Sequence, residues 1–242
     1  MQEWFAEIAA DFTQSFIDSD RWKALLSGLG VTLLITVLAL LIGVVLGVLV
    51  AVVRSSYDQK KKKGGLLGVL NTLCYIYITV IRGTPMMVQL LIMYFVIMVS
   101  STNTMLVATL SFGINSGAYL AEIIRGGIMA VDKGQSEAGR SLGLSYVQTM
   151  RFIVIPQAVK TILPALGNEL IALLKETSIV NVIGMKDITK WAINVQGRTY
   201  QAFMPFIGIA AIYLVIVIVL TKLVSLMERR LANDVTRKRD SH

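Results

Sequence analysis

The sequence is poor in the residues that build disulfides, metal centres and nucleotide sites. Its 242 residues include one cysteine, Cys74, and one histidine, His242, so we expect neither an internal disulfide nor a His/Cys metal site. No segment matches the G-x-x-x-x-G-K-[ST] loop that cradles nucleotide phosphates. We therefore expect this chain to bind no cofactor and no metal, and any ATP that drives its work must be bound by another chain.

Charged residues are also scarce. They make up 16% of the chain against 55% apolar residues, and the mean hydropathy is +0.68, which is the composition of an integral membrane protein without a second soluble domain. The net charge of +8 could suggest nucleic acid, but basic and aromatic residues do not alternate outside the apolar runs. We interpret the positive charge as Lys and Arg flanking membrane helices on the cytoplasmic side, and we expect no nucleic-acid partner.

The apolar runs predict an all-α membrane domain, residues 25–228, that crosses the bilayer five times. Residues 1–24 are acidic and aromatic, which predicts an amphipathic helix at the membrane interface and an N-terminus outside the cytoplasm. The cations Arg54 and Lys60 to Lys63, and a basic tail over residues 229–242, place those segments and the C-terminus inside. The predicted crossings are residues 29–53, 66–99, 104–131, 161–185 and 203–227.

A polar stretch, residues 132–156, interrupts the apolar runs and predicts two short helices around a glycine; we call it the knuckle. The first helix is predicted over residues 135–142, with Gly143 where a left-handed C′ residue is needed. Ser145 then offers an N-cap oxygen with Gln148 three residues later, the spacing of a capping box. The second helix is predicted to end at Pro156, which cannot donate a hydrogen bond.

The knuckle resembles the EAA loop of bacterial ABC-importer permeases, in which Glu-Ala-Ala is followed after fixed spacings by Gly, by Ile and by Leu-Pro. The pattern here is Glu137-Ala138-Gly139, Gly143, Ile153 and Ile155-Pro156, with every spacing kept, Gly139 in place of Ala and Ile155 in place of Leu. In that family the loop is the coupling helix that docks into a groove on the ATPase subunit; an ordinary interhelical loop is the alternative. The resemblance implies that residues 132–160 couple to an ATPase through Glu137, Ala138, Gly139, Arg140, Gly143, Ile153 and Pro156.

The predicted second crossing needs an argument from parity. If the lysine loop and the coupling knuckle are both cytoplasmic, an even number of crossings separates them, yet three apolar stretches lie between. Arg82-Gly83-Thr84-Pro85 supplies a break, because Pro85 disfavours a helix at Thr84. We predict that residues 66–81 run along or partly into the inner leaflet and that residues 86–99 complete the outward crossing.

Charged residues inside the predicted crossings need a reason, because each costs about 2.5–3.5 kcal/mol at mid-membrane on insertion scales. Glu122 and Arg125 lie three apart, which predicts a structural ion pair; direct contact with substrate is the alternative. Residues 118–127 resemble the A-Y-x-A-E-x-x-R-G-G signature of polar-amino-acid permeases, as does the Arg82 to Pro85 break followed by Gln89. The resemblance adds Arg82, Gln89 and Tyr119 to a candidate substrate pathway.

The fourth crossing is unusually polar. Asn168, Ala172, Lys175 and Ile179 share one helical stripe, and Glu169 and Glu176 share its neighbour. Such a helix is expected to face a water-filled path, unless it leaves the bilayer early. The run also resembles the family pattern N-E-x-x-x-L-x-K-x-T-S. The predicted pathway residues of this crossing are Asn168, Glu169, Lys175, Thr177 and Ser178.

Taken whole, the chain resembles the permease subunit of a bacterial ABC importer for polar amino acids, a multi-pass cell-membrane protein with the type I importer permease fold. The resemblance implies two cytoplasmic ATPase subunits that bind ATP and Mg, a second permease subunit (identical or a sister chain) and an extracytoplasmic solute-binding protein. An ion-coupled secondary amino-acid transporter would predict an internal repeat that the sequence lacks, and a membrane scaffold would leave the polar fourth crossing unexplained. Both signs of charge occur on the candidate path, so the amino acid stays open.

Overall fold

The computed structural model describes residues 1–59 and 64–239, and every regular element in these two ranges is helical. Five of the described helical runs are long and apolar enough to cross a membrane, which confirms the predicted all-α membrane fold. Short π and 3₁₀ segments join several of the helices. The α-helices are α1 (Gln2–Phe12), α2 (Arg21–Gln59), α3 (Gly65–Arg82), α4 (Met86–Ile92), α5 (Thr104–Met129), α6 (Lys133–Ser141), α7 (Tyr146–Thr149), α8 (Ile155–Glu176), α9 (Ile188–Thr199) and α10 (Phe203–Arg239).

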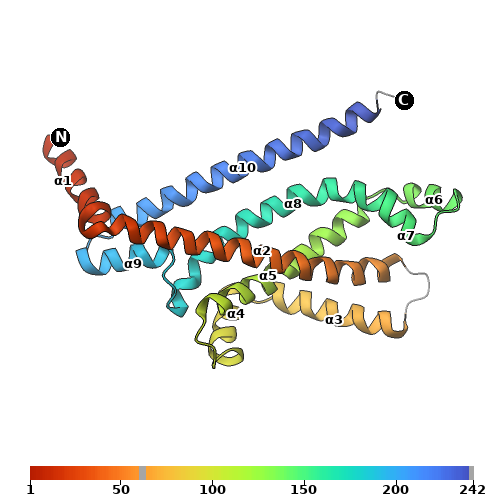
Figure 1. Cartoon of the computed structure of the whole chain (residues 1–242), viewed down its shortest axis with the longest axis horizontal. Helices are drawn as coiled ribbons and strands as arrows, with labels where there is room; N and C mark the ends of the chain where they lie inside the picture. The colour runs from red at the N-terminus through yellow and green to blue at the C-terminus, as the bar shows by residue number, and fades with distance from the viewer. Residues whose placement is uncertain (60–63, 240–242) are drawn as a thin grey trace.

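The molecule is elongated, with α2, α5, α8 and α10 running roughly along its length (Figure 1). The short helices α6 and α7, the end of α2, the start of α3 and the end of α10 lie at one end. The N-terminus, α1 and α9 lie at the other end. This arrangement matches the predicted topology, in which an even number of crossings separates the α2–α3 connection from the knuckle. The predicted lysine loop, Lys60 to Lys63, lies outside the described residues, and which end faces the cytoplasm stays a prediction.

Helices α2 and α5 run parallel and approach closely through small residues. A Cβ atom added at Gly47 would lie 2.7 Å from Leu120 Cβ, and one at Gly113 would lie 2.7 Å from Ile42 Cγ2. Without water to drive association, membrane helices gain most from such close packing. The sequence alone left open whether the glycine pair at Gly43 and Gly47 admits a helix or faces lipid, and the structure places both against α5.

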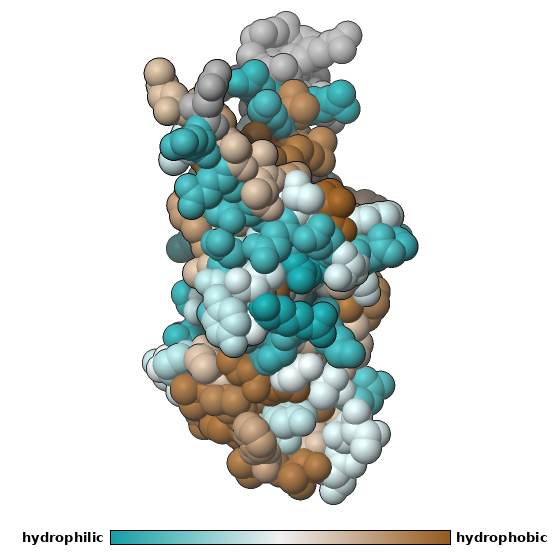
Figure 2. Space-filling view, turned by 90° about the vertical axis from the view of Figure 1, so that its left-hand side faces the viewer, coloured by the Kyte–Doolittle hydropathy of each residue, from teal (hydrophilic) through white to brown (hydrophobic). Residues whose placement is uncertain are grey.

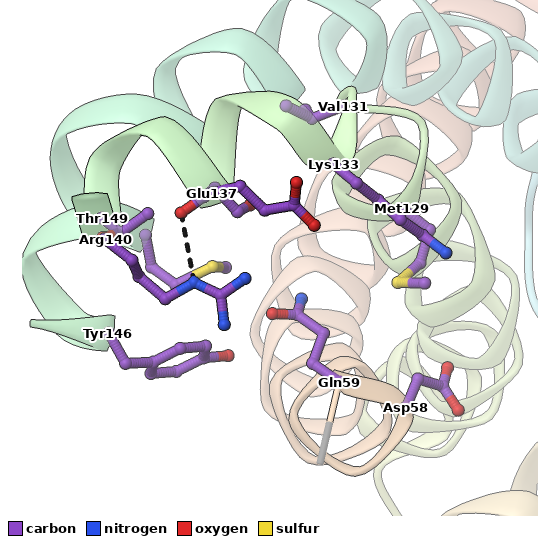
Figure 3. A pocket seen from close by; sticks show the side chains of 11 residues that line it. Asp58, Gln59, Met129, Val131, Lys133, Glu137, Arg140, Tyr146 and Thr149 are labelled. Carbon is purple, nitrogen blue, oxygen red and sulfur yellow. Dashed lines mark hydrogen bonds between the residues drawn. The ribbon is translucent and has the colours of Figure 1, made fainter. Parts of the chain in front are cut away.

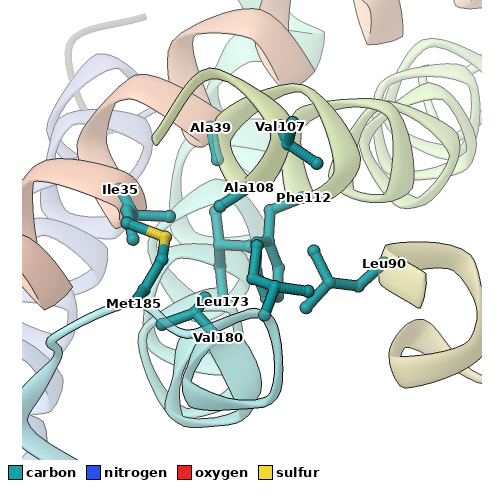
Figure 4. Packing of buried hydrophobic residues seen from close by; sticks show 10 residues of the cluster. Ile35, Ala39, Leu90, Val107, Ala108, Phe112, Leu173, Val180 and Met185 are labelled. Carbon is teal, nitrogen blue, oxygen red and sulfur yellow. The ribbon is translucent and has the colours of Figure 1, made fainter. Parts of the chain in front are cut away.

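A buried apolar cluster ties α2, α4, α5 and the end of α8 together (Figure 4). Phe112 of α5 and Leu90 of α4 are fully buried within it. The 3₁₀ segment Thr177–Ile183 that follows α8 contributes Val180, and the turn after it contributes Met185. This packing joins α4 to α2, to α5 and to the segment that follows α8.

The break falls where the sequence predicts it, with α3 ending at Arg82 and α4 beginning at Met86. Helix α3 runs antiparallel to α2: Arg54 Nη1 donates to Asn71 Oδ1 at 3.2 Å. Its exposed side carries Leu66, Val69, Leu73, Ile76 and Val80. Of the two placements predicted for residues 66–81, entry into the membrane therefore fits this packing better than a course along its surface.

One prediction for the knuckle is wrong: Pro156 does not end the second helix. The chain passes through a π-helical turn, Met150–Val154, and continues as α8 with Pro156 in its first turn. The Ile155 N–H still closes the π-turn on Met150 O, and the fixed φ of a proline near −65° suits the first turn of the α-helix that follows. The knuckle is therefore joined rigidly to the predicted fourth crossing. Its first helix begins at Lys133, two residues earlier than predicted, because Asp132 Oδ1 accepts from the Gly134 N–H at 2.7 Å.

Candidate functional site

Three local signals shape the knuckle. Gly143 has φ +83°, the left-handed conformation that glycine adopts without strain. Around it the Leu144 N–H donates to Gly139 O at 3.1 Å and the Gly143 N–H to Arg140 O at 3.0 Å, which closes the end of α6. The predicted capping box is confirmed: the Gln148 N–H donates to Ser145 Oγ at 3.3 Å, and the Ser145 N–H donates to Gln148 Oε1 at 2.8 Å.

The two halves of the EAA-like pattern meet at Gly139. This glycine is buried, and a Cβ atom there would lie 2.8 Å from Ile153 Cδ1 and 3.1 Å from Thr149 Cγ2. Gln157 Nε2 also donates to Gln135 Oε1 across the same contact at 3.3 Å. Residues fourteen apart in the sequence, Gly139 and Ile153, thus lock α6 against the π-turn that leads into α8.

Much of the knuckle surface is left exposed by the described chain. Glu137, Ala138 and Arg140 are exposed, and Glu137 has no ion pair among the described residues. Leu142 and Phe152 are also exposed, at 81% and 64%. Exposed apolar side chains beside an unpaired charge, at the water-facing end of a bundle, are typical of a docking surface.

The inner side of the knuckle encloses a cavity of about 310 Å³ against the end of α2. Asp58 and Gln59 approach it from α2, and Figure 3 shows Glu137 and Arg140 reaching into the same space from α6. The Arg140 Nε–H is held by Ser136 O at 3.3 Å. Both signs of charge therefore line the junction between the knuckle and the bundle. Its remaining walls are Met129, Val131, Lys133, Ser136, Tyr146, Thr149 and Met150.

A ladder of charges leads from this junction into the bundle. Glu122 and Arg125 form the predicted ion pair at 3.1 Å, and Arg125 also binds Asp58 at 3.0 Å. Arg82 lies 4.0 Å from Glu122, with its guanidinium 5.1 Å from the centre of the Tyr119 ring. Sequence analysis missed Asp58, because nothing in the sequence pairs it with a residue 67 positions later.

A second polar group connects the α3–α4 break with α8. Gln89 Nε2 donates to Ile81 O at 2.7 Å and so caps the end of α3, while its Oε1 accepts from Asn115 Nδ2 at 3.0 Å. Next along α5, Ser116 Oγ donates to Glu169 Oε1 of α8 at 2.9 Å. Sequence analysis missed Asn115 and Ser116, although two adjacent polar residues in the apolar run of residues 104–131 are a signal for them.

The remaining predicted pathway residues do not join this group. Asn168 and Lys175 are exposed on α8, where they share one face with the exposed Gln157 and Thr161. Thr177 is buried instead, and its hydroxyl donates to Leu174 O at 2.7 Å. Ser178 is half-buried, and its carbonyl accepts from Asn181 Nδ2 at 2.6 Å. The eight predicted residues thus form three groups. Arg82, Gln89, Tyr119 and Glu169 lie around α5, and Asn168 and Lys175 lie on an exposed stripe of α8. Thr177 and Ser178 take part in hydrogen bonds at the end of α8.

Comparison with known proteins assigns a family to this architecture. Residues 65–233 match the family described as binding-protein-dependent transport system inner membrane component. The arginine transport system permease protein ArtQ of Bacillus subtilis (strain 168) is 37% identical over 225 residues, covering 87% of this chain and 93% of that protein. The glutamine transport system permease protein GlnP of Escherichia coli (strain K12) is 36% identical over 217 residues, covering 87% and 95%.

Solved structures agree with the sequence comparison. A chain of an amino acid ABC transporter crystallised with histidines is 45% identical and superposes with a TM-score of 0.78, covering 86% of this chain and 94% of that one. A chain of the inward-facing MetNI methionine ABC transporter shares the fold, with a TM-score of 0.72 at 18% identity, covering 90% and 99%. The family is one of transport components, as expected for a chain that is not itself an enzyme. The chain is therefore a multi-pass membrane protein that belongs to the family of inner membrane components of binding-protein-dependent transport systems.

Proposed function

We propose that this chain is the permease subunit of an ATP-driven importer that moves polar or charged amino acids into the cell by alternating access. The observation that carries the proposal is the knuckle: a rigid helix–glycine–helix unit, joined without a break to α8, with its outer side unoccupied by the described chain. The relatives named for arginine and glutamine transport, and the related transporter solved with histidines, support an amino-acid cargo.

In this proposal two cytoplasmic ATPase subunits bind ATP and Mg and dock on the knuckles of a permease pair. Only a ligand with different affinities for two states can bias their equilibrium, and ATP supplies that difference outside this chain. Glu137, which is exposed, would pair with a cation of the ATPase, and the exposed Leu142 and Phe152 would fill its groove. Because the π-turn joins the knuckle to α8, a displacement of one is transmitted to the other.

The cargo path is proposed to follow the polar groups of α5 and α8. Glu169, bound to Ser116 and without a cation within 4.0 Å among the described residues, is the carboxylate best placed for a cargo ammonium or guanidinium. The exposed stripe at Asn168 and Lys175 needs water or another polar surface at membrane depth. A second permease subunit, either a copy or a sister chain, would supply that surface, and an extracytoplasmic solute-binding protein would deliver the amino acid.

The proposal is tested with Gly143→Val in the complete transporter, reconstituted in vesicles. Valine is strained at positive φ, so the knuckle loses its shape while the membrane helices still insert. We expect amino-acid uptake and substrate-stimulated ATP hydrolysis to fall at least tenfold. Gly197→Val is the matched control, because Gly197 has no atom within 4 Å of its added Cβ and no positive φ. Normal substrate-stimulated hydrolysis in Gly143→Val would contradict the coupling role.

Co-purification separates the remaining classes of function. An importer permease should retain an ATPase subunit through purification, and Glu137→Lys should weaken that retention. A secondary transporter or a scaffold would retain none. Screening the amino acids for stimulation of ATP hydrolysis would then identify the cargo.

A further inference from the structure

A second cavity lies at the end of the molecule opposite the knuckle, between the start of α2 and helix α9. Its volume is about 180 Å³. Trp191 Nε1 donates to Arg21 O at 2.9 Å and so joins the two helices at its base. Figure 2 views this end of the molecule and shows hydrophilic surface across its middle, with hydrophobic surface beneath. The cavity is lined by Arg21, Ala24 and Ser27 of α2, by Lys186, and by Trp191, Asn194, Val195 and Arg198 of α9; we call it the α2–α9 groove.

The α2–α9 groove is strongly cationic and has no counter-charge. Arg21, Lys186 and Arg198 line it without any carboxylate among the lining residues. None of the three has a carboxylate within 4.0 Å in the described part of the chain. By contrast, the neighbouring Lys23 is paired with Asp20 at 2.6 Å. Three positive charges that converge on one cavity without an anion are favourable only when water or a bound anion screens them.

Arg21 also carries an unused donor. One of its terminal nitrogens donates to Gln14 O, whereas its Nε–H is buried without a hydrogen-bond partner among the described residues. A buried donor left unpaired costs about 1–3 kcal/mol, so an acceptor in the groove would be stabilising. Ser27 and Asn194 add uncharged donors on the same walls. This donor set is matched to an oxyanion with several acceptor oxygens.

The position of the groove indicates a membrane–water boundary. Arg21 precedes the apolar run of α2, and Lys186 to Arg198 belong to the polar connection between two candidate spans. Beside them, Trp22 and Leu26 are exposed at 42% and 56%. Tryptophan at the edge of an apolar surface is typical of the headgroup region of a bilayer, and Arg and Lys side chains bind phosphate oxygens through charge-assisted hydrogen bonds.

We propose that the α2–α9 groove binds the phosphodiester of an anionic phospholipid, with Arg21, Lys186 and Arg198 around the phosphate and the acyl chains against the exposed apolar side of α2. The lipid holds α9 against α2 and fixes the end of the bundle in the interface. The site requires neither the coupling role of the knuckle nor any particular cargo, so it can fail or stand independently of the proposed transport function.

The test is native mass spectrometry of the detergent-purified transporter, titrated with phosphatidylglycerol. The double variant Lys186→Gln/Arg198→Gln removes two exposed cations and leaves the more buried Arg21 in place. We expect about 25-fold weaker phosphatidylglycerol binding, from about fivefold for each cation near an anionic headgroup. The conservative Lys186→Arg/Arg198→Lys variant should bind as the unchanged protein does. The control is Lys23→Gln/Lys222→Gln, which makes the same change in net charge at exposed positions outside the groove.

The other arms of the test identify the source of the anion. Phosphatidylcholine, which carries the phosphodiester without net charge, should bind at least tenfold more weakly than phosphatidylglycerol. Inorganic phosphate that displaces the lipid with equal affinity would overturn the proposal in favour of a free-anion site. Equal phosphatidylglycerol binding by Lys186→Gln/Arg198→Gln and by the control would overturn it as well. So would a variant that keeps its lipid but no longer docks the solute-binding protein, because the groove would then bind an acidic protein surface.

Discussion

The knuckle and the polar interior of the bundle contain similar residues but are held together in opposite ways. In the knuckle, Gly143, Ser145 and Gln148 act on neighbours no more than five positions away. In the interior, Arg125 reaches back 67 positions to Asp58, and Ser116 reaches 53 positions ahead to Glu169. The turn and the helix cap of the first region follow from local chemistry, and its longest hydrogen bond, from Gln157 to Gln135, spans 22 positions. The second region exists only once the membrane helices have packed.

The interior should therefore be the more sensitive region to loss of one side chain. Arg125→Gln removes the ion-pair partner of Asp58 and leaves Glu122 only the longer 4.0 Å contact with Arg82, at sites where the side chains of Arg125, Asp58 and Glu122 are 25–28% exposed. Breaking a buried ion pair costs about 3–5 kcal/mol, and partial exposure places this one near 3. Thermal unfolding in detergent measures the loss.

The control for Arg125→Gln is Lys23→Gln, which breaks a pair whose side chains are 60% and 63% exposed. Such exposed pairs contribute about 0–1 kcal/mol, so its midpoint should hardly move. Equal midpoints for the two variants would show that the interior ladder contributes no more than a surface pair.

The contact between α2 and α5 is the next most sensitive feature. Gly47→Ala places a Cβ atom 2.7 Å from Leu120 Cβ, and overpacking of this kind costs about 1–3 kcal/mol. Gly126→Ala, on α5, meets nothing within 4 Å and should instead stabilise its helix by up to about 1 kcal/mol. The two alanines should therefore shift the unfolding midpoint in opposite directions. If both variants shift the unfolding midpoint in the same direction, helix propensity and not the close approach of α2 and α5 determines the effect of these substitutions.

These distances in sequence explain how much of the structure could be predicted. The capping box at Ser145 and the left-handed Gly143 are encoded by residues that touch each other, so their geometry follows from spacing alone. The prediction that the second knuckle helix ends at Pro156 is wrong for a related reason. Pro156 is compatible with helix in a first turn, and a π-turn in front of it is not visible in residue types.

The interior was predicted only in part. Glu122 and Arg125 are one helical turn apart, so their pairing was readable from spacing. The polarity of Thr177 and its motif predict a place on the pathway, and this stays a prediction; its hydroxyl donates to Leu174 O of its own helix, a bond that polarity alone does not reveal. Asn115 and Glu169 acquire partners from other helices, and one sequence does not specify which helices meet.

A small change within the knuckle should sharpen the contrast. Ser145→Ala removes the N-cap acceptor of α7, a loss of about 1 kcal/mol. Because the bonds involved are local, hydrogen exchange should rise at the amides of Gln148 and Thr149 while the global unfolding midpoint stays within about 2–4 °C of its original value. Ser141→Ala, at an exposed position of α6, is the control and should leave that exchange unchanged. A global midpoint that falls as far as in Arg125→Gln would contradict the local character of the knuckle.

Asp187, the N-cap of α9, combines local hydrogen bonds with burial by a distant helix, so its variants compare the two effects at one residue. It is a local N-cap, accepting from the Thr189 and Lys190 N–H groups at 3.0 and 2.9 Å, yet it is 1% exposed because the start of α2 packs over it at Gly28. Burial raises the pKa of the Asp187 carboxyl, although the backbone hydrogen bonds oppose the shift. A carboxyl whose pKa is higher in the folded state stabilises the fold most below its unfolded pKa of about 3.9, and that contribution is lost as pH rises through the folded value.

Asp187→Asn should remove this pH dependence while keeping the cap, because asparagine caps helices as well as aspartate does. The unfolding midpoint of Asp187→Asn relative to that of the unchanged protein should therefore rise between pH 4 and pH 7. Each kcal/mol of stability that the unchanged protein loses over this range corresponds to a rise of about 2–4 °C. Asp187→Ala loses the cap as well and should be less stable than Asp187→Asn by about 1 kcal/mol at every pH. A constant difference between Asp187→Asn and the unchanged protein across this range would mean that local capping, and not burial by distant helices, governs the residue.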